Sequence, residues 1–83
     1  MNKVMVEVYL PSVGRSYDVR IPGTVRLGDI IPLMERLFAD IAYGYYIPDS
    51  ETVLCDRLTG VALDVNLTPM EMGIINGTRL MLI

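Results

Sequence analysis

The sequence of 83 residues contains no histidine, no tryptophan and a single cysteine, Cys55. These absences exclude an intramolecular disulfide, a zinc site of the Cys/His type and any catalytic triad or dyad that needs histidine. A lone cysteine in an apolar stretch is usually a small buried residue, and no pattern of basic residues here is set to lower its pKa. We therefore interpret Cys55 as structural, and we expect a protein of a reducing compartment without catalytic residues or cofactors.

Basic side chains are also scarce: one lysine and six arginines are scattered from Lys3 to Arg79, and the net charge is −3. A nucleic-acid or anionic-lipid partner normally requires a basic cluster, so we expect neither. No apolar run approaches the roughly 18 to 20 residues that span a bilayer, and the N-terminal residues alternate where a signal peptide would be continuously apolar. The sequence thus indicates a cytoplasmic protein that does not insert directly into a membrane.

The middle of the chain carries the clearest pattern, in which apolar residues recur every three or four positions between Leu27 and Tyr43. This spacing predicts one amphipathic α-helix with its apolar stripe in the core. Pro32 is expected near the first turn, where its missing N–H is tolerated, and Gly44 with Pro48 should end the helix. No side chain suited to an N-cap precedes the helix, so its start should depend on packing. The stripe consists of Leu27, Ile30, Ile31, Met34, Leu37, Phe38 and Ile41.

Residues alternate with a period of two at 3–10, 16–22 and 78–83, which predicts strands there; a short apolar run predicts another strand at 52–56, with a stub at 61–63 that pairs back on it. Gly14 suits a turn residue with positive φ, Pro69 should begin a single helical turn, and Asn76-Gly77 should form a tight turn. A helix with one apolar face needs a sheet to cover it. We therefore predict a single α+β domain over residues 1–83, with a mixed sheet of four to five strands packed on one α-helix.

The final run, from Leu67-Thr68-Pro69 through Gly73-Ile74-Ile75-Asn76-Gly77 to the closing Leu80-Met81-Leu82, resembles the ubiquitin-like β-grasp family. A second resemblance lies in the helix, where Val25-Arg26-Leu27-Gly28-Asp29-Ile30-Ile31-Pro32-Leu33-Met34 is similar to the YukD/EsaB group of small ubiquitin-like proteins. The same segment is similar to the ubiquitin-like domain of EccD. Both groups belong to bacterial type VII secretion systems, and the proline after two aliphatic residues is the most specific feature.

These resemblances imply a non-enzymatic protein-binding module, an accessory or regulatory component of a type VII (WXG100/ESX) secretion system associated with a membrane secretion complex. One alternative is a generic ubiquitin-like adaptor or enzyme-complex subunit unrelated to secretion. Another is a carrier whose C-terminal tail is chemically used. The carrier is disfavoured because the sequence ends Met81-Leu82-Ile83 and has no Gly-Gly.

Two further groups of residues have a functional and a structural interpretation. Asp49, Glu51 and Asp56 could bind a hard cation, but they lack the spacing of an EF-hand loop and suit a solvated surface better. Gly73 and Gly77 lie near each other without forming a phosphate-binding loop before a long helix, so we interpret them as turn glycines. We expect no metal site.

Protein-binding candidates come from two places. Met5, Leu54 and Met81 should share the sheet face that does not pack on the helix, provided that Val53 and Cys55 point inward, and adjacent large apolar residues there would suit a partner. A homodimer packed sheet on sheet is the other interpretation of such a face. The second place is the segment that follows the helix, where Tyr43, Tyr45 and Tyr46 should leave at least one ring near the surface.

Overall fold

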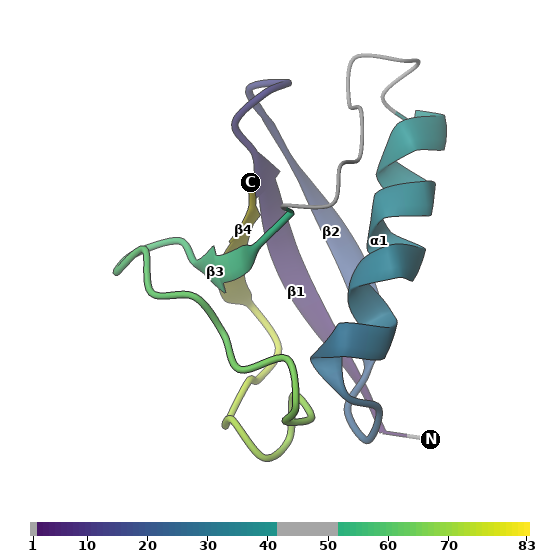
Figure 1. The fold of residues 1–83 in the computed structure, drawn as a ribbon, viewed down its shortest axis with the longest axis vertical. Coiled ribbons are helices and arrows are strands. Elements are labelled where there is room, and N and C mark those ends of the chain that lie inside the picture. The colour runs from purple at the N-terminus through teal and green to yellow at the C-terminus, as the bar shows by residue number, and fades with distance from the viewer. Residues whose placement is uncertain (1, 42–51) are drawn as a thin grey trace.

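A computed structural model describes residues 2–41 and 52–83. Within these ranges the four strands form one mixed sheet in the order β2-β1-β4-β3, with β1 parallel to β4 and the other pairs antiparallel. Helix α1 lies against one face of this sheet (Figure 1). The predicted α+β fold, with one helix on a mixed sheet, is confirmed. The elements are β1 (Lys3–Leu10), β2 (Arg15–Pro22), α1 (Leu27–Ile41), β3 (Leu54–Asp56) and β4 (Thr78–Leu82).

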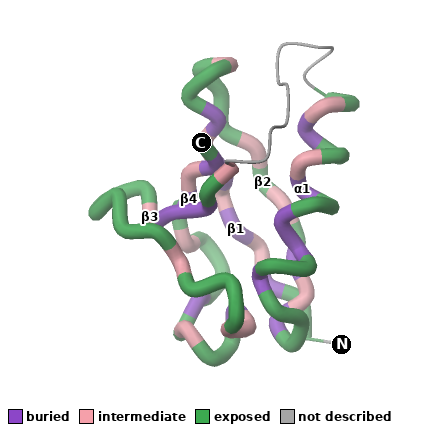
Figure 2. The backbone as a smooth tube through the Cα atoms, viewed as in Figure 1, coloured by how far each residue is buried: buried purple, intermediate pink, exposed green. Residues whose placement is uncertain are grey.

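Strand β1 shows directly how the sequence pattern becomes a core. Its even-numbered side chains, from Val4 to Leu10, are buried, whereas Met5, Glu7 and Tyr9 are half-buried on the other face. The buried residues of β1, α1 and β4 form one apolar cluster between the helix and the sheet (Figure 2). Successive side chains of a strand point to opposite faces, so the alternation of β1 alone separates the core face from the open face.

The parallel pairing of β1 with β4 is fixed by the turn that precedes β4. The backbone N–H of Met5 donates to Oδ1 of Asn76 over 2.8 Å, and the N–H of Gly77 donates to the carbonyl of Met5 over 2.8 Å. Gly77 has φ of 90°, in the left-handed region that favours glycine. The predicted turn at Asn76-Gly77 is confirmed, and its side-chain amide also satisfies the backbone of β1.

The N-terminus of α1 is capped by backbone and not by a side chain. The N–H groups of Leu27 and Gly28 donate to the carbonyls of Leu67 (3.0 Å) and Val65 (2.9 Å), which takes up two donors that a helix start leaves without a partner. A Cβ at Gly28 would lie only 3.2 Å from the Val65 oxygen, so a side chain there would push the loop away. The helix start thus depends on packing, as expected, through this loop.

Helix α1 begins at Leu27, as predicted, and Pro32 is its sixth residue, which lies beyond the first turn. At that position an N–H would donate to the carbonyl of Gly28, four residues earlier, so Pro32 removes a helical bond. The prediction that its missing N–H is one of the unpaired first-turn donors is therefore wrong. The predicted helix end at Tyr43, with Gly44 and Pro48 after it, lies outside the described residues.

The apolar stripe of α1 is only partly buried. Phe38 is fully buried and packs its ring 5.7 Å from that of Tyr17, but Leu37 is 40% exposed and Ile41 is 37% exposed. The expectation that Leu37 and Ile41 belong to the core is wrong, since the sheet does not extend far enough to cover them. Helix residues Leu27, Ile30, Ile31, Met34 and Phe38 are buried.

The second predicted hairpin is shorter than expected. Strand β3 has three residues, and the returning segment predicted at 61–63 pairs with it through one isolated bridge between Cys55 and Ala62. The helical turn predicted at Pro69 is present as a hydrogen-bonded turn. Thr68 and Glu71 exchange two bonds there, each side chain accepting from the other residue's N–H, in the manner of a capping box. No helix in the described residues is long and apolar enough to cross a bilayer.

We predict that Phe38→Ala lowers the free energy of unfolding by about 3 to 5 kcal/mol, because a large buried side chain leaves a cavity when truncated. The matched control is Leu37→Ala, at the preceding helix position. It should lower the free energy of unfolding by about 1 kcal/mol or less, since much of that side chain is already in water. Chemical denaturation of both variants provides the comparison. Equal losses would contradict the boundary between buried and exposed helix residues described above.

Candidate functional site

The face of the sheet that does not pack on α1, here called the open face, is set by the register of the strands. Glu7 of β1 lies opposite Arg79 of β4, and Tyr9 lies opposite Met81. Met81 in turn lies opposite Cys55 of β3. Because alternate residues share a face, all five side chains start from the open side of the sheet.

Met5 and Met81 therefore share the open face, but they are not neighbours. Met81 lies opposite Tyr9, which is four residues along β1 from Met5, or about 13 Å at the usual rise of a strand. Glu7 and Arg79 occupy the space between them and form an ion pair of 3.8 Å. The face is divided by charge, and the two methionines belong to different parts of it.

Leu54, the third candidate, does not belong to this face. Its side chain is 2% exposed and lies in the core, and its partner across the ladder is Leu82. Val53 is 41% exposed instead, and its backbone exchanges two hydrogen bonds with Ile83, which is 57% exposed. The assignment of faces in this strand is wrong by one residue, and such a slip exchanges every inward and outward side chain.

The residues that the open face does bring together are Tyr9, Val53, Met81 and Ile83, here called the apolar corner. Tyr9, Val53 and Ile83 were not among the binding candidates predicted from the sequence. The alternation of β1 and β4 contained the signal for Tyr9 and Ile83, since each lies an even number of residues from a candidate methionine. Val53 had no such signal, because the apolar run around it does not alternate.

Arg57 crosses the open face and borders the apolar corner. Its Nη1 donates to Oε1 of Glu7 and to Oγ of Ser16, each over 3.2 Å, and its guanidinium carbon lies 4.2 Å from the centroid of the Tyr9 ring. The ion pair is about one-third exposed at both ends, so it contributes little stability. Its effect is geometric: the guanidinium covers one side of the Tyr9 ring and connects the turn after β3 with β1 and β2.

Cys55 also starts from the open side but is only 2% exposed. Its thiol donates to the carbonyl of Met81 over 3.4 Å. Burial raises the pKa of the thiol above its ordinary value of 9.0, and the negative charge of Asp56 raises the pKa further. The interpretation of Cys55 as a buried structural residue is confirmed, since a neutral thiol held by a carbonyl is a poor nucleophile.

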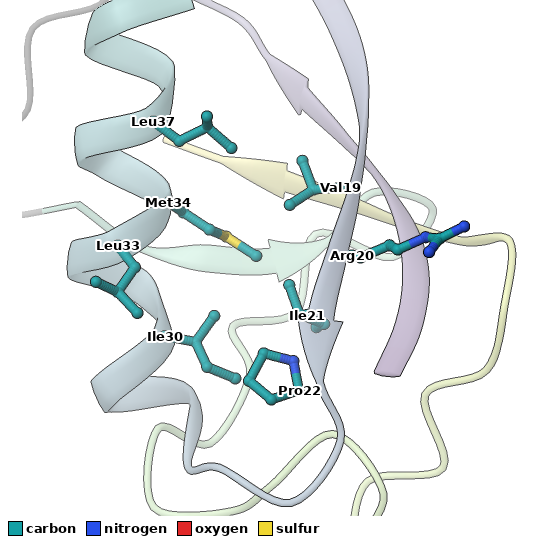
Figure 3. A pocket seen from close by; sticks show the side chains of 8 residues that line it. All are labelled: Val19, Arg20, Ile21, Pro22, Ile30, Leu33, Met34 and Leu37. Carbon is teal, nitrogen blue, oxygen red and sulfur yellow. The ribbon is translucent and has the colours of Figure 1, made fainter. Parts of the chain in front are cut away.

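A separate apolar groove of about 130 Å³ lies on the helix side, between α1 and β2 (Figure 3). Met34 and Ile30 of the helix point toward Val19 and Ile21 of the strand, while the side chain of Arg20 points away from the helix. β2 is an edge strand of the sheet. The groove is lined by Val19, Arg20, Ile21, Pro22, Ile30, Leu33, Met34 and Leu37.

Among the other candidates from the sequence, those that lie in the described ranges form no site. Asp56 accepts hydrogen bonds from the N–H groups of Leu58 and Thr59, over 2.8 and 3.0 Å, and so closes a turn. In the described ranges no three acidic, histidine or cysteine side chains gather where a metal could be held. Gly73 and Gly77 have positive φ and are turn glycines, as predicted. Asp49, Glu51, Tyr43, Tyr45 and Tyr46 lie outside the described residues.

A helix on a four-stranded mixed sheet, with β1 and β4 central and parallel, defines the ubiquitin-like β-grasp class, and solved structures agree. The ubiquitin-like domain of the Mycobacterium tuberculosis type VII secretion protein EccD1 matches with a TM-score of 0.81 at 13% identity, covering 100% of this chain and 99% of that chain. The EccD5 ubiquitin-like domain from Mycobacterium xenopi has a TM-score of 0.87 at 16% identity, covering 100% and 94%.

A third match is a chain of the ESX-5 inner membrane complex, with a TM-score of 0.79 and 18% identity; it covers 100% of this chain and 21% of that one. No family model matches the sequence, and no curated protein matches it. The predicted similarity to the ubiquitin-like domain of EccD is confirmed. At these identities the likeness establishes a shared fold.

We predict that Cys55 makes stability fall at alkaline pH. The thiol pKa is raised in the folded state, so the stabilisation is complete below the pKa of the unfolded thiol and is lost as pH rises through the folded value. The window therefore opens near pH 9.0 and extends upward. Denaturation of wild type and Cys55→Ala from pH 7 to 10.5 should show a steeper alkaline loss for wild type. Parallel curves would mean that the thiol is not buried.

Proposed function

We propose that this domain is a non-enzymatic protein-binding module that serves as an accessory or regulatory component of a type VII secretion system. The observation that carries the proposal is the match to EccD ubiquitin-like domains over essentially the full length of both chains. A domain of the same size and topology in a secretion protein is a direct precedent for such a module. The likeness to the YukD/EsaB group belongs to the same proposal.

A secretion complex is the setting that fits this proposal. A chain of the ESX-5 inner membrane complex and a chain of the ESX-3 core complex contain a region of this fold. In the chain of the ESX-5 complex, this region is about a fifth of the length. The domain described here would hold a position similar to that of such a region. It would bind neighbouring components of the complex through its surface.

The apolar corner is the surface that we assign to this partner. Val53 and Ile83 are exposed and joined by backbone hydrogen bonds, and Tyr9 and Met81 lie beside each other on the adjoining strands. A contiguous apolar group rimmed by charged residues, here Glu7, Arg57 and Arg79, is typical of a protein interface. Met81 suits such a place because its flexible side chain adapts to a partner.

Two features of the earlier prediction change with this assignment. Leu54 is withdrawn because it is part of the core, and Met5 lies on the far side of the Glu7–Arg79 pair. Met5, Tyr45 and Tyr46 stay predictions as further contact residues. A generic ubiquitin-like adaptor unrelated to secretion is the rival function, and genes for WXG100 substrates and an FtsK-like ATPase beside this one would favour secretion.

We predict that Met81→Asp or Ile83→Asp abolishes capture of type VII secretion components from the native cell, because a carboxylate at the apolar corner would be buried without a partner. The melting temperature should stay nearly unchanged, since neither side chain is part of the core. Affinity capture with mass spectrometry provides the measurement.

Ile75→Asp is the matched control, since Ile75 is 69% exposed in the loop before β4 and should leave capture intact. Light scattering over a range of concentrations separates the homodimer interpretation, which requires the two corner variants to become monomeric. Unchanged capture and unchanged oligomeric state would reject the apolar corner as the interface.

A further inference from the structure

The apolar surface of α1 is wider than the sheet that it covers. Ile30, Leu33, Met34 and Leu37 follow one another at intervals of three, one and three residues, which places them on one flank of the helix. Ile30 and Met34 are buried, but Leu33 is 59% exposed and Leu37 is 40% exposed. This flank faces the side of β2 where the sheet ends, and the groove lies between the two (Figure 3). The helix therefore presents apolar side chains where one more strand would lie.

The backbone of β2 has N–H and C=O groups that point to its free edge and could bind such a strand. The N–H of Gly23 donates to the carbonyl of Asn2 over 2.6 Å, and the antiparallel register continues from this pair through Val4 with Ile21 and Val6 with Val19. Alternate pairs in an antiparallel ladder exchange hydrogen bonds, so the N–H and C=O groups of Val19 and Ile21 are used by β1. Those of Asp18 and Arg20 point to the free edge. No described strand pairs with that edge.

Side-chain positions on β2 specify the chemistry of the missing strand. Val19 and Ile21 line the groove, and Arg20 lies on the opposite face. A strand added beside them would place alternate side chains in the groove and the intervening ones next to Arg20. Apolar residues fit the first set, because the residues that line the groove are apolar apart from Arg20, whose side chain points away from it.

Among the intervening side chains of the added strand, those next to Arg20, a negative charge is favoured at one end of the edge. Lys3 and Arg20 line a hollow on the open face together with Met5 and Asn76. The ion pairs found among the described residues, Arg57–Glu7 and Arg79–Glu7, involve neither of these two cations. Asp18 follows on the same face of β2, so a carboxylate is favoured at the Lys3 end of the edge and not at the Asp18 end.

We propose that the groove between α1 and β2 binds an extended segment of another protein, which adds to β2 as a fifth strand. The segment carries apolar side chains at alternate positions and an acidic side chain between them, next to Arg20 and Lys3. Main-chain bonds to Asp18 and Arg20 supply affinity, and the groove supplies specificity, as in other cases of β-strand addition. This site is distinct from the apolar corner and does not depend on the function proposed above.

The test begins with a displayed library of random nine-residue peptides, selected against the folded domain. Selected peptides should alternate apolar residues and carry Asp or Glu between them. Bound to labelled protein, they should shift the backbone amide signals of Asp18 and Arg20 and the methyl signals of Leu33 and Leu37. Replacing the acidic residue of the peptide by its amide should weaken binding several-fold.

Three variants decide whether the edge and the groove carry the binding. Leu33→Asp changes an exposed side chain and should reduce affinity at least tenfold without unfolding the domain. Asp18→Pro removes a donor that faces the free edge, where proline is tolerated, and should reduce affinity about tenfold relative to Asp18→Ala. Arg20→Ala should weaken acidic peptides selectively. Met81→Asp, the variant of the apolar corner, should bind the peptides normally.

Other outcomes would overturn the proposal. Peptides that shift Tyr9 and Met81, and that lose affinity in Met81→Asp, would place peptide binding on the open face. Self-association that Leu33→Asp and Asp18→Pro abolish would mean that the edge pairs with a second copy of this chain. A library that yields no binder at the groove would reject the site while leaving the assignment of the apolar corner untouched.

Discussion

The parallel pairing of β1 with β4 is the constraint on which the rest of this domain depends. A parallel pair cannot be closed by a tight turn, so a long crossover connection must run between Leu10 and Thr78. That connection contains β2 and β3, which form the two edges of the same sheet, and α1, which packs on it. The last loop of this connection also caps the helix, because the carbonyls of Val65 and Leu67 accept hydrogen bonds from its first N–H groups. Further along the same loop, Asn76 and Gly77 form hydrogen bonds with the backbone of Met5. The helix start and the central register are thus held by neighbouring parts of one loop.

The sequence predicted best where local pattern and tertiary packing agree. β1 alternates over its whole length, and its buried and half-buried faces are the predicted ones; Asn76-Gly77 is likewise a turn on local grounds alone. The faces of β3 were misassigned because the strand has only three residues, and its Leu54 and Cys55 are apolar like Val53 directly before them. Without alternation nothing local chooses the face, and the choice is made by pairing with Leu82.

The helix shows a different limit. Periodicity identified α1 and its buried residues Met34 and Phe38, because a helix that packs on anything must present one face. How wide that face is depends on the sheet opposite, and a sequence does not state where a sheet ends. Leu37 and Ile41 satisfied the periodicity and are exposed nonetheless, since β2 is the last strand on that side. The same mismatch between helix and sheet creates the groove.

The two proposed surfaces lie at opposite borders of the sheet. The apolar corner lies on the open face, where β3 and β4 meet the end of β1 at Tyr9, and the groove lies beside β2, on the helix face. Three strand spacings of about 4.8 Å, or roughly 14 Å, separate β2 from β3, in addition to the thickness of the sheet. A partner at one surface would leave the other accessible. With two separate binding surfaces, this small domain would hold two proteins at the same time. A single interface on one face of the sheet would hold only one.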